Sequence, residues 1–184
     1  MNMLLRFPTA TRAAQAVGSA AAVLALTACA VLSRPGAVAV AELQPTRDYS
    51  AVGTVRFEQW DDKVRISGEV RGLKPNAEHG FHLHDKGDCS SGDGTSAGGH
   101  FNPRGSMHGR YNSLAHHAGD LVSLQADANG VARFNFETAD VTVTPGPVSV
   151  VGRAVIVHRD PDDFKSQPAG NAGPRMACGV VRAQ

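Results

Sequence analysis

Short segments in which hydrophobic and polar residues alternate recur after about residue 50. In residues 63–70, Val64, Ile66 and Val70 fall on one side, and charged or small polar residues fall on the other. This two-residue period predicts a half-buried antiparallel strand. Similar alternation or apolar runs predict further strands at 54–58, 78–84, 119–125, 132–136, 148–157 and 177–182.

Turn residues separate these segments, as in Asn129-Gly130, where both residues tolerate positive φ. No segment beyond the N-terminal 28 residues has a convincing helical period. The 184 residues include 20 Gly and 10 Pro, with 42% hydrophobic residues, which indicates a turn-rich domain with a packed core. We therefore expect an all-β domain, either a sandwich or a barrel.

Two long segments, 85–118 and 159–175, interrupt the strands and are rich in Gly, Ser, Asp and Pro. Loops of this length in a compact domain are usually functional or disordered. The first segment contains one cysteine and four histidines that could form a functional site, and the second leads to Cys178. A disulfide or a metal site would hold such loops in place.

The first 28 residues predict a secretory signal peptide. Arg6 and Arg12 precede an apolar stretch, 13–28, that is short for a membrane span. The stretch ends in Leu-Thr-Ala before Cys29, which resembles the bacterial lipoprotein cleavage site, so we expect cleavage before Cys29 and lipid on its thiol. The alternative is an ordinary signal peptide that is cut later, near Ala39 or Ala41.

These signals divide the chain into a signal peptide at 1–28, a tether at 29–47 and one folded domain at 48–184. We expect an exported protein of the periplasm or cell envelope, in contact with a membrane only through the lipid on Cys29. Ala30 carries no acidic retention signal, which favours the outer membrane if the organism is Gram-negative. The formal net charge of +1 provides no general attraction to nucleic acid, so we expect no such partner.

With Cys29 assigned to lipid, Cys89 and Cys178 remain as an even pair in an exported protein, which predicts a disulfide. This bridge would close a loop of about 90 residues and stabilise the fold by about 4 kcal/mol.

All eight histidines lie between residues 79 and 158. His82 and His84 are two residues apart on a predicted strand, so both rings project from the same face. A lone histidine is more often a surface or hydrogen-bonded residue, but this clustering predicts a metal site because imidazole is the commonest metal ligand. The candidates are His82, His84, His100, His108, His117, Asp120 and His158.

Three motifs resemble those of the copper–zinc superoxide dismutases: His-Gly-Phe-His-Leu-His at 79–84, Ser-Ala-Gly-Gly-His-Phe-Asn-Pro at 96–103, and Gly-Asn-Ala-Gly-Pro-Arg-Met-Ala-Cys-Gly at 170–179. The resemblance covers about residues 48–182. It implies a Greek-key β-sandwich or barrel of about eight antiparallel strands with two long functional loops, and it implies one copper and one zinc ion per subunit.

The resemblance also implies a role for individual residues. His82, His84, His100 and His158 match the copper ligands. The zinc ligands are matched by His100, His108, His117 and Asp120, so that His100 would bridge the two metals. Asp162 matches a carboxylate that bonds one copper ligand and one zinc ligand, and Arg175 matches the arginine that holds the anionic substrate. We class His79 as structural and expect His116 to be solvated.

The implied reaction converts superoxide to dioxygen and hydrogen peroxide in two steps at copper. Arg175 docks the substrate, and His100 takes and returns a proton; zinc fixes His100 and performs no redox step. The loop before Arg175 has Lys165 as its only positive charge over 162–170, and this residue either guides the substrate or is merely solvated. Subunit contacts differ within the family, so both a monomer and a homodimer remain open.

Three rival interpretations use some of the same residues. A copper–zinc buffer or carrier on the same fold would typically lose a copper ligand or the arginine, whereas all four histidines and Arg175 are present. A zinc β-lactamase-like hydrolase would need aspartate where Lys86 stands, and a cupin would need glycine at Asn76. Neither of the last two explains Arg175 or Cys178.

Overall fold

The computed structural model of the protein describes residues 36–184. This part of the chain is all-β, with a single 3₁₀ turn, η1 (Thr95–Ala97). The all-β prediction is confirmed. The strands are β1 (Val38–Pro45), β2 (Val52–Trp60), β3 (Lys63–Arg71), β4 (Glu78–His79), β5 (Phe81–His84), β6 (Leu124–Gln125), β7 (Ala132–Thr138), β8 (Ala154–His158), β9 (Arg175–Val180) and β10 (Arg182–Ala183).

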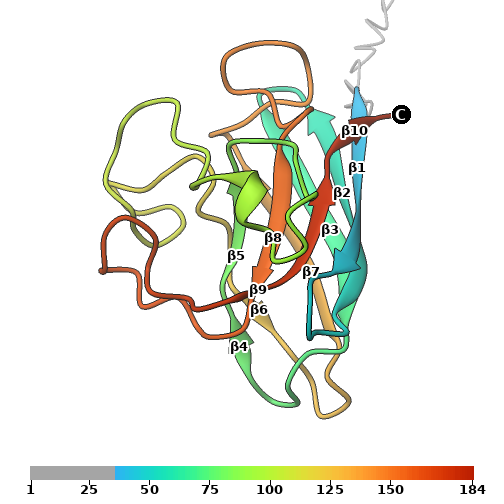
Figure 1. Cartoon of the computed structure of the whole chain (residues 1–184). Coiled ribbons are helices and arrows are strands. Elements are labelled where there is room, and N and C mark those ends of the chain that lie inside the picture. Colours follow the sequence, from blue (N-terminus) through green and yellow to red (C-terminus); the bar gives the residue numbers. More distant parts are fainter. Residues whose placement is uncertain (1–35) are drawn as a thin grey trace, which may run out of the picture. The chain divides into compact units, whose positions relative to one another are not determined.

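Eight of these strands form one antiparallel sheet in the order β5-β8-β9-β1-β2-β3-β7, with β10 also paired to β1. Strand β1 joins the two halves of this sheet. Its residues Val38 to Leu43 pair with β2, whereas Gln44 and Pro45 pair with Cys178 and Ala177 of β9. The sheet curls so that β5, β8 and β9 face β2, β3 and β7, as Figure 1 shows.

The core fills the space between the two halves of the curled sheet. Strands β2 and β3 contribute Phe57 and Ile66, which are directly paired and fully buried. Phe81 of β5 meets Phe134 of β7 with ring centroids 5.2 Å apart, so aromatic contact spans the two edges of the strand order. The alternation of hydrophobic and polar residues in β2, β3 and β7 therefore corresponds to one face of each strand that packs in the core.

The predicted tether at 29–47 is wrong over residues 38–45, which form β1. Ala39, Ala41 and Leu43 alternate with more exposed neighbours and are buried against the core. Small alanine side chains made this alternation inconspicuous in the sequence. Cleavage near Ala39 or Ala41 would cut into β1, which argues against the later cleavage site. The predicted signal peptide and Cys29 lie outside the described residues.

Two other predicted strands are shorter than expected. Within 119–125, only Leu124 and Gln125 form a strand, and Asp120 makes an isolated bridge to His82. Within 148–157, the strand begins at Ala154 and continues to His158. No helix in residues 36–184 is long and apolar enough to cross a membrane.

Truncating Ile66 tests the core. We expect Ile66→Ala to lower the free energy of unfolding by about 2–5 kcal/mol and Ile66→Val by about 0.5–1.5 kcal/mol, because the side chain is fully buried. Lys63→Ala, at an exposed position on the same strand, should change it by less than about 0.5 kcal/mol. Urea unfolding of the metal-free protein measures all three. Equal losses for Ile66→Ala and Lys63→Ala would contradict this account of the core.

Candidate metal centre

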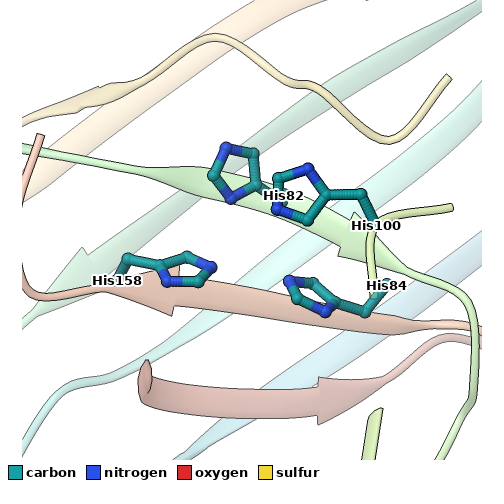
Figure 2. A group of neighbouring side chains, drawn as sticks. All are labelled: His82, His84, His100 and His158. Atoms are coloured by element: carbon teal, nitrogen blue, oxygen red, sulfur yellow. The ribbon is translucent and has the colours of Figure 1, made fainter. Parts of the chain in front are cut away.

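Four histidine rings gather where β5 meets β8. The two strands are paired, with His82 opposite Ile156 and His84 opposite Ala154, and His158 ends β8. His100 reaches the same place from the long loop through an isolated bridge to His84. Figure 2 shows the four rings turned toward a common space. One ring nitrogen from each lies within 4.8 Å of the others.

Each of these four rings has one nitrogen with a partner and one without. The partnered nitrogens face Asp162 (2.7 Å) from His82, the Gly98 carbonyl (2.9 Å) from His84, Asp120 (2.8 Å) from His100 and the Gly173 carbonyl (3.1 Å) from His158. The buried nitrogens without a hydrogen bond are His82 Nδ1, His84 Nε2, His100 Nε2 and His158 Nε2. Buried polar atoms without a partner are costly, and a metal ion would satisfy all four together. An all-nitrogen set suits copper.

A second group is centred on Asp120. Its Oδ1 atom lies 2.8 Å from His100 Nδ1, 3.0 Å from His108 Nδ1 and 3.3 Å from His117 Nδ1. Ligand atoms at the corners of a tetrahedral zinc site with bonds of about 2.0 Å are about 3.3 Å apart, so these four atoms need to move little to hold zinc. The other oxygen, Oδ2, accepts the backbone N–H groups of Gly109 (3.1 Å) and His117 (2.8 Å).

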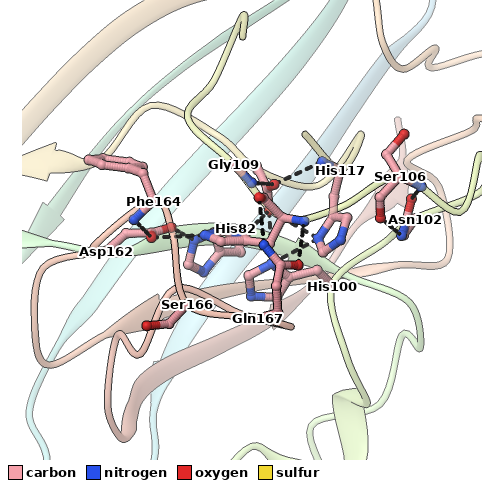
Figure 3. Close-up of polar contacts among 12 residues, drawn as sticks. His82, His100, Asn102, Ser106, Gly109, His117, Asp162, Phe164, Ser166 and Gln167 are labelled. Carbon is pink, nitrogen blue, oxygen red and sulfur yellow. Dashed lines mark hydrogen bonds and ion pairs between the residues drawn. The ribbon is translucent and has the colours of Figure 1, made fainter. Parts of the chain in front are cut away.

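The two groups share His100 and are joined again by Asp162. His100 presents Nδ1 to Asp120 and Nε2 to the first group, which is the arrangement that a bridging imidazole requires. Asp162 lies 2.7 Å from His82 Nε2 through one oxygen and 2.9 Å from His108 Nε2 through the other (Figure 3). Such carboxylates fix the tautomer and the orientation of metal-binding rings.

Arg175 lies beside the first group as the first residue of β9. A pocket of about 230 Å³ is lined by Arg175, His84, His100 and His158 together with neighbouring loop residues. The half-buried guanidinium donates to the carbonyls of Gly94 and Gly98, the latter at 2.7 Å. Burial lowers the pKa of Arg175, but guanidinium remains a cation in proteins. The pocket therefore has a fixed positive charge beside three of the four histidines.

The family comparisons agree with this geometry. Residues 51–181 match the family model described as copper/zinc superoxide dismutase (SODC). A superoxide dismutase [Cu-Zn] of Paramecium bursaria Chlorella virus 1 is 44% identical over 135 residues, 70% of this chain and 71% of the relative. The corresponding protein of Saccharomyces cerevisiae is 42% identical over 142 residues, 73% of this chain and 91% of the relative.

The chain belongs to the copper/zinc superoxide dismutase family. A solved structure of the clock protein EA4 is also similar, with a TM-score of 0.72, 39% identity and coverage of 80% of this chain and 94% of that chain. The family uses copper and zinc, and its named relatives are oxidoreductases. The two residue groups described above are the places where such ions fit this chain.

The pKa shifts of most of these residues favour the protonation states that bind metal. Burial lowers the pKa of His84 and His158 well below the usual histidine value, and it lowers that of His100 to about 4 despite the opposing effect of Asp120. Burial alone would raise the pKa of Asp120, but hydrogen bonds from three histidines outweigh it and hold the pKa well below its usual range. At pH 7 these three rings are neutral and the carboxylate is ionised, the forms that bind metal.

His108 is the exception. Burial lowers its pKa, but Asp120 and Asp162, one at each ring nitrogen, outweigh burial and raise the pKa to about 9. The ring therefore carries a proton at pH 7 in the metal-free state, and zinc must displace it.

The predicted disulfide is present. Cys89 is bonded to Cys178 with a Cα–Cα distance of 5.8 Å, and it ties the first long loop to β9, three residues beyond Arg175. The same loop supplies the two carbonyls that hold the guanidinium, Gly94 and Gly98. The disulfide therefore restrains both the arginine and its partners.

Two histidines lie outside the metal-binding groups. His79 is fully buried and its Nδ1 lies 2.9 Å from the His158 carbonyl, which fits the predicted structural role. The prediction that His116 is solvated is wrong: its ring lies 3.0 Å from Asp140 and 2.8 Å from the Ser113 carbonyl. Asp140 lies 24 residues beyond His116 in the sequence, and no local sequence signal indicated this pairing.

Replacing Asp162 tests the link between the two groups. We expect Asp162→Asn to weaken zinc binding by about 10–100-fold, because one amide cannot accept a hydrogen bond from both His82 and His108. Asp163→Asn is the matched control, since Asp163 is exposed and bonds only within its own loop. Titration against a zinc chelator of known affinity measures the difference. Equal affinity in the two variants would contradict the assigned role.

Proposed function

We propose that this protein dismutates superoxide: two superoxide anions and two protons give one dioxygen and one hydrogen peroxide. The observation that carries the proposal is the pocket that Arg175 shares with His84, His100 and His158, whose free nitrogens converge with that of His82. Copper would be held by His82, His84, His100 and His158, and zinc by His100, His108, His117 and Asp120. Copper bound there would supply the one-electron redox chemistry, and zinc would supply a fixed positive charge beside His100.

Arg175 binds the substrate in this mechanism. Two of its donors are used by the carbonyls of Gly94 and Gly98, which fixes the plane of the guanidinium and leaves its other N–H groups for a small anion. The same positive charge attracts superoxide into the pocket, so the rate of encounter falls as salt rises.

His100 handles one of the two protons. Its Nε2 atom faces the first group, and whenever this nitrogen is not occupied by a metal it would hold a proton that can pass to the anion bound at Arg175. Water supplies the second proton of hydrogen peroxide. Asp120 and its neighbours hold the opposite nitrogen, Nδ1, so the ring keeps its orientation while Nε2 gains and loses the proton.

A copper–zinc carrier is the alternative that uses the same ligands. Metal storage needs no cation over the metal, whereas here Arg175 is held by two carbonyls and is restrained by a nearby disulfide. These contacts fix the position of a group that would bind substrate, and this favours the enzyme over the carrier.

We propose further that the enzyme is exported and anchored by lipid at Cys29, where it protects the cell envelope. The support is the N-terminal pattern of Arg6, Arg12 and the apolar stretch before Cys29, together with the disulfide, which fits an oxidising compartment. Superoxide is an anion and crosses membranes poorly, so an enzyme there intercepts superoxide that arises outside the cytoplasm.

The decay of superoxide after pulse radiolysis tests the reaction. We expect rapid decay with the copper- and zinc-loaded protein and none above background with the metal-free form. Arg175→Ala should slow the reaction by at least about tenfold and flatten its salt dependence, since the local charge is lost. Arg71→Ala, which removes an exposed surface charge, should behave as wild type. Slow decay at full copper occupancy would favour the carrier.

Mass spectrometry of the mature protein tests the anchor. We expect an N-terminus at Cys29 carrying a diacylglycerol, and release of the protein from membranes in Cys29→Ala. An unmodified N-terminus that begins beyond residue 29 would contradict the lipid anchor and leave the reaction unaffected.

A further inference from the structure

The second long loop lies directly on His108. Asp162 reaches the Nε2 atom of His108 at 2.9 Å, and the Arg110 guanidinium lies over the Phe164 ring at 4.0 Å. An added Cβ at Gly170 would stand 2.5 Å from His108 Nε2, so the backbone of the loop also approaches the ring closely. Residues 162–170 therefore cover residues 108–110.

The side chain of Gln167, in the same loop, contacts the backbone of His108 and not its ring. Its Oε1 atom accepts the His108 N–H at 2.9 Å, and its Nε2 atom donates to the His108 carbonyl at 3.0 Å (Gln167 is labelled in Figure 3). Residue 108 belongs to no strand. Among the described residues, the hydrogen bonds found for its backbone N–H and carbonyl both go to this single side chain.

This double hydrogen bond matters because the His108 ring must meet Asp120 at a fixed angle. The ring nitrogens are held by Asp120 at 3.0 Å and by Asp162 at 2.9 Å, but the ring hangs from a loop. A shift of the His108 backbone would move Nδ1 away from its place beside Asp120. Outer partners of metal ligands commonly change metal affinity or activity by about 10–100-fold when they are removed.

We infer that Gln167 is a positioning residue for the zinc site: its side-chain amide holds the backbone of His108 so that the ring stays in place to bind zinc. The inference rests on the proposed assignment of His108 as a zinc ligand. Only a primary amide of this length fits, because the contact needs one donor and one acceptor together. Glutamate lacks the donor, and asparagine is one methylene shorter.

The test measures the transfer of zinc to a chromogenic chelator from the full-length, zinc-loaded protein. We expect Gln167→Met, which keeps the length of the side chain and loses both hydrogen bonds, to release zinc about tenfold faster than wild type. Gln167→Asn should be similarly fast, because its amide falls short of His108. Ser166→Ala is the control: Ser166 lies in the same loop and bonds Asp163, not His108.

Cobalt(II) loaded into the zinc site gives a readout that general loosening of the loop would not produce. We expect the visible bands of the cobalt protein to change in Gln167→Met and to be preserved in Ser166→Ala. The melting temperature of each metal-free variant shows that it is folded, and a modest decrease in Gln167→Met is expected because the buried backbone of His108 loses two hydrogen bonds. Wild-type release rate and an unchanged cobalt spectrum in Gln167→Met would overturn the inference. Failure of the wild type itself to bind zinc would instead overturn the ligand assignment on which the inference rests.

Discussion

The buried carboxylate of Asp120 is the constraint on which the site depends. Its oxygens meet three histidine rings and two backbone N–H groups, so every lone pair of a charge taken out of water finds a partner. The cost of burying it is offset only if the first long loop, residues 85–118, brings those partners to the same place. The path of the first long loop is therefore tied to this one group, and the second long loop reaches it only indirectly, through the contact of Asp162 with His108.

The two sides of the site are supported in different ways. His82, His84 and His158 stand on β5 and β8, whose register is fixed by backbone hydrogen bonds and whose side chains are packed in the core. His100, His108 and His117 stand on loop segments that belong to no strand. These segments are restrained instead by a disulfide and by the contacts of Asp162 and Gln167 with His108. Rigid strands thus set the proposed copper side, and side-chain contacts between loops set the proposed zinc side.

The sequence predicted most of the fold and site, for identifiable reasons. The alternation in β2, β3 and β7 was legible because large side chains mark the buried face, and the paired cysteines and clustered histidines carry strong chemical signals. Strand β1 was missed because alanines at 39 and 41 bury little area and give a weak period. Two contacts could not be predicted from the sequence: that of His116 with Asp140 and that of His108 with Gln167. Each joins residues far apart in the sequence through ordinary polar groups.

The carbonyl of Gly98 accepts hydrogen bonds from two functional groups, His84 Nδ1 at 2.9 Å and the Arg175 guanidinium at 2.7 Å. Because both donors share one oxygen, the two side chains are thermodynamically coupled. When one donor is lost, the strength and the direction of the remaining hydrogen bond change. The free energies of substitutions at these positions will not add, because each single variant already perturbs the shared acceptor. The proposed copper ligand His84 and the proposed substrate-binding Arg175 are thus held by the same peptide oxygen, so a change at one side chain is felt at the other.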